Sequence, residues 1–310
     1  MRFLTRLSER LRHRGQAEAT LPVVPPQLTV RVVTDSTASL PSDVAERLGI
    51  VVVPLRVITD DGELREGVDE TVEQIGDRLS AGQRLTTSQP PPEVFATVYQ
   101  QLLDDGATEV LSIHLSGELS GTCAAAESAA ARANLPVTVV DSGMAAATLG
   151  FAVMAAAECA TTGATAEQVA ARAREVAASG AVLFLVDSLE YLRRGGRLSA
   201  GSAALGAALG VRPILEIAEG RVQLVRRVRT RKAALDKLVS LAVGHTKGMS
   251  RAAVAVHHVE ATDRAVEAAA RLEHLLDIPV AVAPAGAVLS VHTGPGSLAI
   301  CAADVGNHSH

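Results

Sequence analysis

The chain has 310 residues, a formal net charge of -5 and 48% hydrophobic residues, but only 2% aromatic residues and no Trp. This length suits roughly two domains with aliphatic cores. Because basic residues are not in excess and few aromatic side chains can stack on bases, no nucleic-acid partner is expected. The three cysteines are too few and too far apart for a disulfide framework or a zinc site, so we expect reduced thiols in a cytoplasm, with no metal and no cofactor.

The first 27 residues differ from the rest and are expected to form a basic extension and linker. Five arginines stand against one acid in residues 1–15, and Phe3 and three leucines recur at helical spacing. A disordered extension is the preferred interpretation. Transient contact of a basic amphipathic helix with an anionic membrane surface is the alternative. Because no long apolar segment is present, a secretory signal is not expected.

Residues 28–178 are predicted to form a Rossmann-like α/β domain with a parallel sheet. Apolar, β-branched runs predict strands at 28–34, 50–58, 109–115 and 137–141. Helical patterns lie between most of them, and strands alternating with helices are typical of a parallel sheet covered on both faces. The Ala-rich run 145–160 is shorter than a membrane span and carries an acid, so it predicts a buried helix.

Residues 179–305 are predicted to form a second, α+β domain with a mixed sheet. A strand is expected at 181–187, and the turn Ala218-Glu219-Gly220 between two short apolar runs predicts a hairpin. Helices and further strand-like runs follow, and the latter lie at 252–258, 279–285 and 298–302. The pattern changes near residue 179, which is where we place the domain boundary.

Hydroxyl-bearing loops are expected at four strand-to-helix junctions of the first domain. They contain Asp35-Ser36-Thr37, Thr86-Thr87-Ser88, Ser116 to Thr122, and Asp141-Ser142-Gly143. The carboxyl ends of parallel strands meet at one edge, so these loops should converge on one crevice. Ser and Thr cap helices and leave backbone N–H groups facing such a crevice, which favours an anion. Taken singly, each loop is also explained by ordinary helix capping.

A serine esterase is the rival hypothesis. Ser120, His292 and Asp35 or Asp141 supply the residue types of a Ser-His-Asp triad. The Gly-x-Ser-x-Gly spacing of a nucleophile elbow is missing around Ser120. No glycine-rich phosphate loop of the usual patterns occurs either, so a nucleotide is not expected.

The second half contains three further segments with residues that could bind an anion. Basic clusters lie at 193–197 and 226–231, and a Gly-rich segment at 292–296 joins two strand-like runs. Arginines near an anion suit the handling of a phosphoryl group, and a solvated face with salt bridges is the alternative. His257 and His258 are neighbours on a predicted strand and should point to opposite faces, which argues against a shared metal.

Eight short motifs occur in an order that resembles the DegV family, whose members include the fatty-acid-binding subunit of bacterial fatty acid kinase. The motifs are Val33 to Thr37, Val53 to Leu55, Thr87 to Pro90, Leu119 to Thr122, Val140 to Ser142, Gly195 to Ser199, Val228 to Thr230, and His292 to Gly296. The resemblance covers residues 28–304. It implies a Rossmann-like first domain and a second α/β domain, with the acyl chain of a long-chain fatty acid buried between them.

The resemblance also implies a role for individual residues. Thr87 and Ser120 would hold the fatty-acid carboxylate, with His292 close by. A separate ATP-dependent kinase would phosphorylate that carboxylate to an acyl phosphate, and Arg197 and Arg229 resemble residues for this transfer or for kinase contact. The chain itself would then be a carrier and not an enzyme. Secondary candidates for the carboxylate site are Asp35, Ser36, Thr86, Ser88, Ser116 and Thr122.

The chain departs from the family pattern in the loop Ser116 to Thr122, which we call the head-group loop because it contains Ser120. Ser116 is followed by Gly117 and Glu118, where the family often has a second serine. Glu118 would either place negative charge near the ligand carboxylate or face a partner. A regulatory, lipid-sensing module without a kinase is therefore kept as a third hypothesis beside the carrier and the esterase.

Overall fold

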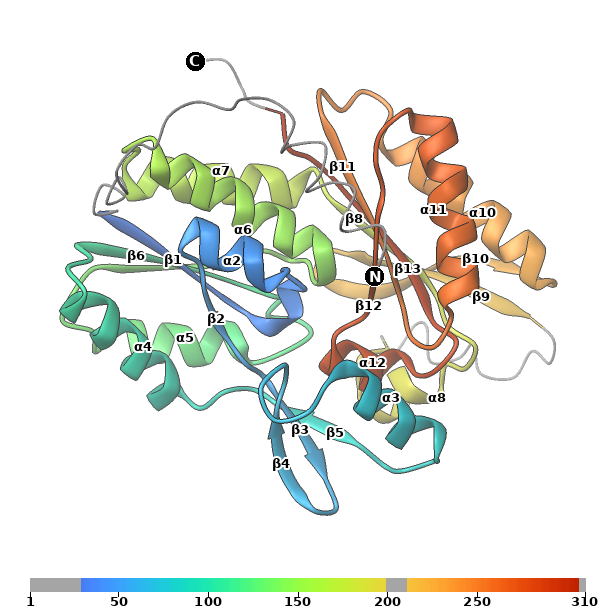
Figure 1. The fold of residues 1–310 in the computed structure, drawn as a ribbon, viewed down its shortest axis with the longest axis horizontal. Coiled ribbons are helices and arrows are strands. Elements are labelled where there is room, and N and C mark those ends of the chain that lie inside the picture. The colour runs from blue at the N-terminus through green and yellow to red at the C-terminus, as the bar shows by residue number, and fades with distance from the viewer. Residues whose placement is uncertain (1–28, 199–210, 307–310) are drawn as a thin grey trace, which may run out of the picture.

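The computed structural model describes residues 29–198 and 211–306. The expected basic extension and linker, residues 1–27, lie outside the described residues, as does most of the Gly/Ala-rich stretch after Arg197. Within the described part, the strands form three sheets (Figure 1). No helix in that part is both long enough and apolar enough to cross a bilayer.

A four-stranded parallel sheet in the order β2-β1-β6-β7 forms the first layer. Its strands are β1 (Val30–Asp35), β2 (Val51–Val53), β6 (Glu109–His114) and β7 (Val137–Asp141). The helices on its two faces are α4 (Pro92–Asp104) and α5 (Thr122–Ala130) on one side, and α6 (Ala146–Thr161) and α7 (Ala166–Ala178) on the other. Because both faces are covered, the strands consist mostly of valine, leucine and isoleucine, many of them buried, and their polar residues lie mainly toward their ends. The predicted α/β class and its parallel sheet are confirmed.

Pro54 divides the run that was predicted to be one strand over residues 50–58, so this prediction is wrong. The residues after Pro54 form a separate antiparallel sheet in the order β4-β3-β5. Its strands are β3 (Arg56–Thr59), β4 (Gly62–Arg65) and β5 (Thr86–Ser88). Proline lacks the backbone N–H that a continuous ladder needs. The expectation that Thr86-Thr87-Ser88 follows a strand of the parallel sheet is also wrong, because these residues are themselves strand β5, in which Thr87 pairs with Val57.

A six-stranded mixed sheet in the order β10-β9-β8-β13-β11-β12 forms the other large layer. Its strands are β8 (Ala181–Leu185), β9 (Arg212–Ala218), β10 (Arg221–Val228), β11 (Ala252–His258), β12 (Ala281–Pro284) and β13 (Leu298–Asp304). Glu219 and Gly220 join β9 and β10 with φ angles of 52° and 74°, the left-handed pair that a tight hairpin turn requires. The outer face is covered by α10 (Arg231–His245) and α11 (Thr262–Leu276).

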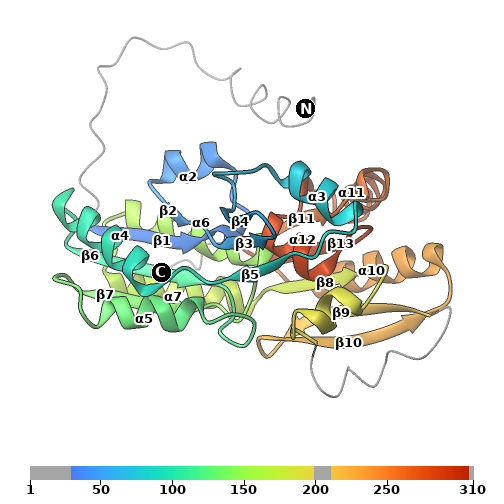
Figure 2. The same ribbon diagram turned by 90° about the horizontal axis from the view of Figure 1, so that it is seen from below.

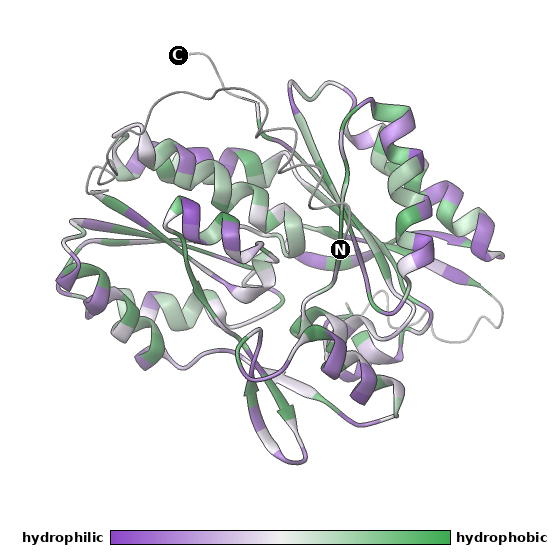
Figure 3. Ribbon diagram, in the orientation of Figure 1, coloured by the Kyte–Doolittle hydropathy of each residue, from purple (hydrophilic) through white to green (hydrophobic). Residues whose placement is uncertain are grey.

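The two large sheets lie side by side along the long axis of the molecule (Figures 1 and 2). One apolar cluster joins them, because it contains Val32 and Leu111 of the parallel sheet together with Phe184 and Leu215 of the six-stranded sheet. Helix α6 contacts both sheets. Figure 3 shows hydrophobic residues concentrated on the strands, with hydrophilic residues on the outward sides of the helices.

Short helices complete the described part of the chain. They are the 3-10 helix η1 (Ser36–Ala38), α2 (Ser42–Leu48), α3 (Val72–Ser80), α8 (Glu190–Arg194) and α12 (Ala287–Thr293). Helix α12 packs against α3, α8, β3 and β5. It therefore links the six-stranded sheet to the small antiparallel sheet, at the place where the cavity described next is found.

Candidate functional site

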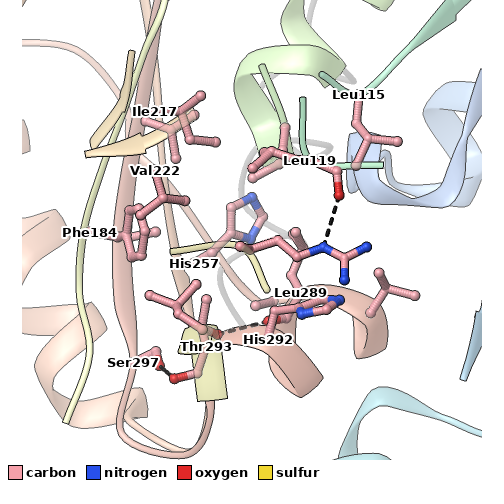
Figure 4. A pocket seen from close by; sticks show the side chains of 18 of the residues that line it. Leu115, Leu119, Phe184, Ile217, Val222, His257, Leu289, His292, Thr293 and Ser297 are labelled. Carbon is pink, nitrogen blue, oxygen red and sulfur yellow. Dashed lines mark hydrogen bonds between the residues drawn. The ribbon is translucent and has the colours of Figure 1, made fainter. Parts of the chain in front are cut away.

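A cavity of about 380 Å³ lies between the loops of the parallel sheet, strand β5, helix α12 and the inner face of the six-stranded sheet. Pockets for small ligands usually measure about 300–1,000 Å³. Most of the lining side chains are aliphatic, and Figure 4 shows several of them around the open space, among them Leu115, Leu119, Ile217, Val222 and Leu289. The cavity therefore suits a ligand that is largely apolar.

Thr87 and His292 meet at the polar part of this cavity. The Oγ1 atom of Thr87 lies 2.8 Å from Nε2 of His292, although the two residues are 205 positions apart in the sequence. Strand β5 carries Thr87, and α12, which packs against that strand, carries His292. The expectation that His292 lies in a Gly-rich turn between two strands is wrong, since it lies in the last turn of a helix.

The His292 ring is neutral at physiological pH. Burial, followed by the nearby charge of Arg197, lowers its pKa from 6.5 to about 4. Its Nδ1 atom is buried and has no hydrogen-bonding partner in the described part of the chain. A Cβ atom at Gly195 would lie only 2.3 Å from this Nδ1, so a residue without a side chain is required where α8 ends against α12.

Arg197 lines the cavity and is half-buried. Its Nε donates to the backbone oxygen of Leu119 over 2.9 Å, and its Nη1 donates to the backbone oxygen of Gly195. Among the described residues no carboxylate pairs with it, and burial lowers its pKa. The cavity thus contains a cation whose charge nothing described nearby neutralises.

Ser120 also lines the cavity. Its Oγ lies 2.9 Å from Oγ1 of Thr122, a fully buried residue at the start of α5. A Cβ atom at Gly121 would lie 2.2 Å from the side chain of Gln89, so this glycine allows the head-group loop to approach the segment after β5. The hydroxyl partner of Ser120 is therefore a threonine and not a histidine.

Asp35 belongs to a buried network outside the cavity. Its Oδ2 lies 3.0 Å from Nδ1 of His114, and Nε2 of His114 lies 2.7 Å from Oγ of Ser112. The hydroxyl of Tyr99 donates to the same Ser112 over 2.9 Å. Although this is the atom order of a Ser-His-Asp triad, all four side chains are fully buried and none lines the cavity. The arrangement links the carboxyl ends of the inner strands β1 and β6 and is out of reach of a substrate.

Two further candidate serines are used in internal contacts. Ser36 donates to Glu66 and accepts from the backbone N–H of Leu55. Ser116 donates to the backbone oxygen of Gly220 over 2.7 Å, which ties the head-group loop to the β9–β10 hairpin. Neither residue lines the cavity.

The remaining candidates divide between the cavity and the surface. Ser88 lines the cavity, whereas Thr86 and Arg229 are exposed and do not. Glu118 forms an ion pair of 2.7 Å with Arg221, so its charge is directed to a neighbouring arginine. Of the residues chosen from the sequence, the structure brings together Thr87, Ser88, Ser120, Arg197 and His292.

Sequence reasoning missed His257 and Ser297 and noted Gln89 only as part of the motif Thr87 to Pro90, and all three residues line the cavity. His257 was considered only as a metal ligand. Its alternation with Ala253 and Ala255 along an apolar strand was the signal that it faces the interior. Among the residues that the structure describes, no three His, Cys, Asp or Glu side chains converge as a metal site requires.

The chain is similar to proteins of one family over most of its length. The model of a family described as "Uncharacterised protein, DegV family" matches residues 29–305. The chain belongs to the DegV family. A DegV domain-containing protein of Streptomyces coelicolor is 43% identical over 275 residues, which are 87% of this chain and 97% of the relative. A DegV domain-containing protein of Mycobacterium tuberculosis is 39% identical over 282 residues, 90% of this chain and 98% of the relative.

Solved DegV structures share the whole described fold. The fatty-acid-binding DegV family protein of Thermus thermophilus has 36% identity and a TM-score of 0.82, and the match covers 89% of this chain and 99% of that protein. DegV of Bacillus subtilis, a fatty-acid-binding protein, has 30% identity and a TM-score of 0.82 over 89% of this chain and 99% of its own. DegV proteins with this fold thus bind fatty acids.

Proposed function

We propose that this DegV protein binds one long-chain fatty acid, with the carboxylate beside Arg197 and the acyl chain in the aliphatic part of the cavity. The observation that carries the proposal is the half-buried guanidinium without a described counter-ion in a cavity whose other walls are mostly apolar. An unpaired buried charge is unfavourable. A ligand with one anionic head and one long tail supplies a counter-ion for the guanidinium and apolar groups that fill the aliphatic part of the cavity.

The expected energetics fit such a ligand. Burying about 14 methylene groups at about 0.8 kcal/mol each gives roughly 11 kcal/mol before costs. Association and the ordering of a flexible chain oppose binding by several kcal/mol. Affinity therefore comes mainly from the tail, and the polar groups fix the position of the head.

We assign the head-group contacts as follows. Neutral His292 donates through Nε2 to Thr87, which leaves the hydroxyl hydrogen of Thr87 free for one carboxylate oxygen. Ser120 accepts from Thr122 and donates to the ligand. Arg197 supplies the positive charge. This assignment rests on the distances of 2.8 Å and 2.9 Å within the two pairs and on the low pKa of His292, about 4.

Binding is favoured over ester hydrolysis by the partners of Ser120. A serine nucleophile needs a histidine that accepts its proton. Here Ser120 pairs with Thr122, and His292 pairs with Thr87. The only described Ser-His-Asp arrangement, at Ser112, is fully buried.

We further propose that a separate ATP-dependent kinase in the cytoplasm phosphorylates the bound carboxylate. The γ-phosphoryl group would pass to a carboxylate oxygen, giving an acyl phosphate and ADP. Gln89 lines the cavity and is also exposed, and its neighbour Thr86 is exposed, which supports a head group close to the surface. Arg229 is exposed and lies outside the cavity, as befits a residue that contacts the kinase and not the ligand.

The binding proposal is tested by mass spectrometry of an organic extract of the purified protein and by titration of delipidated protein with a fluorescent fatty acid. We expect near one long-chain acid per chain. Thr87→Val and Ser120→Ala should each weaken binding about tenfold or more, the effect of losing one hydrogen bond to a charged group. Protein that carries no acyl chain and takes up neither palmitate nor oleate would refute the proposal.

The kinase step has its own test with a cognate kinase and ATP. Arg229→Ala should leave fatty-acid binding within about twofold and lower acyl-phosphate formation at least tenfold, since arginines that neutralise phosphoryl charge act on turnover. Binding without any phosphorylation would favour a lipid-sensing module. Ester hydrolysis that Ser120→Ala abolishes would favour the esterase.

A further inference from the structure

One histidine on the floor of the cavity has no part in the head-group contacts. The strand registers place five side chains in a row across the six-stranded sheet, namely Leu215, Phe184, Ala299, His257 and Ala283 on β9, β8, β13, β11 and β12. Alternate residues of a strand share a face, and Leu215 and Phe184 of this row belong to the core shared with the parallel sheet. His257 is therefore the polar member of an otherwise apolar floor, and Figure 4 shows its ring among the lining side chains.

The His257 ring has unused hydrogen-bonding capacity. It is only 4% exposed, and among the residues that the structure describes neither of its nitrogens finds a hydrogen-bonding partner at normal geometry. Its cross-strand neighbours, Ala299 and Ala283, have no polar side chain to offer. A buried polar group without a partner is destabilising, so a ligand atom that satisfies it gains affinity.

The polar side chains near His257 already have partners. Ser297 donates to the backbone oxygen of Thr293 over 2.8 Å. Thr293 donates to the backbone oxygen of Leu289 over 2.9 Å. His258 accepts from the backbone N–H of Ala261. Of these four cavity-lining residues, His257 is the one whose side chain makes no hydrogen bond to the described part of the chain.

The charge state of His257 selects the kind of group it can bind. Burial lowers its pKa, and neighbouring His258 adds to the effect, while the nearby backbone of Ala283 and Pro284 opposes it. The other ionisable side chains that line the cavity are His292 and Arg197, and neither favours a proton on His257. An ionised carboxylate only accepts hydrogen bonds, so it would leave the acceptor nitrogen of a neutral ring unsatisfied. A hydroxyl group needs only the donor and the acceptor that a neutral imidazole offers.

We propose that His257 forms a second polar subsite and that the preferred ligand is a long-chain acid with a hydroxyl group on its chain. This inference rests on the proposed fatty-acid binding and refines the class of the ligand. Without such a hydroxyl, the ring would face methylene groups and stay unsatisfied. The carboxylate of the ligand lies at Arg197 and the hydroxyl group would lie at His257 on β11. The length of acyl chain between these two residues therefore decides which carbon atom carries the hydroxyl group.

The experiment measures displacement of a fluorescent fatty acid from delipidated protein by octadecanoic acid and by the four isomeric hydroxyoctadecanoic acids that carry the hydroxyl group at the second, tenth, twelfth or seventeenth carbon. The parent protein is compared with His257→Leu, which removes both polar atoms at similar volume, and His257→Asn, which keeps a donor and an acceptor. Phe184→Leu, a change in the same row of the sheet, is the matched control. Thermal melting checks that each variant folds.

We expect one isomer to bind the parent protein about tenfold more tightly than octadecanoic acid. His257→Leu should abolish this preference, His257→Asn should retain part of it, and Phe184→Leu should affect all acids alike. The proposal is overturned if no isomer is preferred, or if His257→Leu weakens every acid equally, which would place His257 at the carboxylate. In both cases octadecanoic acid still binds, whereas loss of all binding by the parent protein would refute the proposed function itself.

Discussion

Replacing Arg197 with methionine tests the charge at the centre of the proposed site. Methionine keeps an unbranched apolar stem and removes the guanidinium, so the packing of the cavity wall changes little. A hydrogen bond to a charged partner contributes about 1.5–3 kcal/mol, and two unit charges 4 Å apart attract by about 4 kcal/mol at an effective dielectric constant of about 20. Arg197 is only half-buried, so we take about 2 kcal/mol for the net effect, which is about a 30-fold loss of affinity for a fatty acid.

A neutral ligand separates charge from packing in this measurement. Palmitic acid and hexadecanol share the same chain, and only the acid carries a charge that Arg197 can neutralise. Arg197→Met should therefore weaken palmitate about 30-fold and change the affinity for hexadecanol no more than about twofold. The assay is displacement of a fluorescent fatty acid from delipidated protein at fixed ionic strength.

Arg229→Met is the matched control for Arg197→Met, because it removes the same group from an exposed position outside the cavity. It should leave both affinities within about twofold, the range for losing a screened surface charge. Equal losses for palmitate and hexadecanol in Arg197→Met would show that Arg197 packs against the chain and does not neutralise the head. Unchanged palmitate binding would remove Arg197 from the site.

Two further predictions concern stability. Ser112→Ala breaks the buried hydrogen bonds to Tyr99 and His114 and should lower the free energy of unfolding by about 2 kcal/mol in a urea titration, with fatty-acid binding unchanged; lost binding in a folded variant would contradict the structural role. Because the pKa of His292 is about 4 in the folded state and 6.5 in the unfolded state, its contribution to stability is present above pH 6.5 and is lost as the pH falls toward 4. His292→Gln should lack that acid-induced loss, which amounts to roughly 3 kcal/mol by pH 4, and identical pH profiles for variant and parent would count against the assignment.

Elements specified by local signals could be predicted from the sequence. The β9–β10 hairpin followed from two apolar runs around Ala218-Glu219-Gly220, and the two positive φ angles occur at Glu219 and Gly220. The Ala-rich helix α6 followed from its composition and is buried along most of its length. Such features depend on residues a few positions apart, which a single sequence displays directly.

Features that depend on distant segments could not be predicted in the same way. Strand β5 has the polar sequence Thr86-Thr87-Ser88, and only pairing with β3 makes it a strand. The contact of Thr87 with His292 joins segments 205 residues apart, and the DegV resemblance placed both at the head group where periodicity did not. Asp35 was expected near the ligand because it follows the predicted strand 28–34, but no local signal indicated that His114 would hold it between the carboxyl ends of β1 and β6.

The position of the cavity inside the shared core ties the lifetime of the protein to its ligand. An empty, dry cavity destabilises a protein by about 24 cal/mol per Å³, so 380 Å³ sets an upper bound of about 9 kcal/mol. That is comparable to the whole folding free energy of a typical domain, and water entering the cavity reduces the penalty. If the protein binds a fatty acid as proposed, we expect the unliganded chain to open more often and to be degraded first. Under the proposed function, the cellular amount of this protein would rise and fall with the supply of its acyl ligand, without any change in transcription.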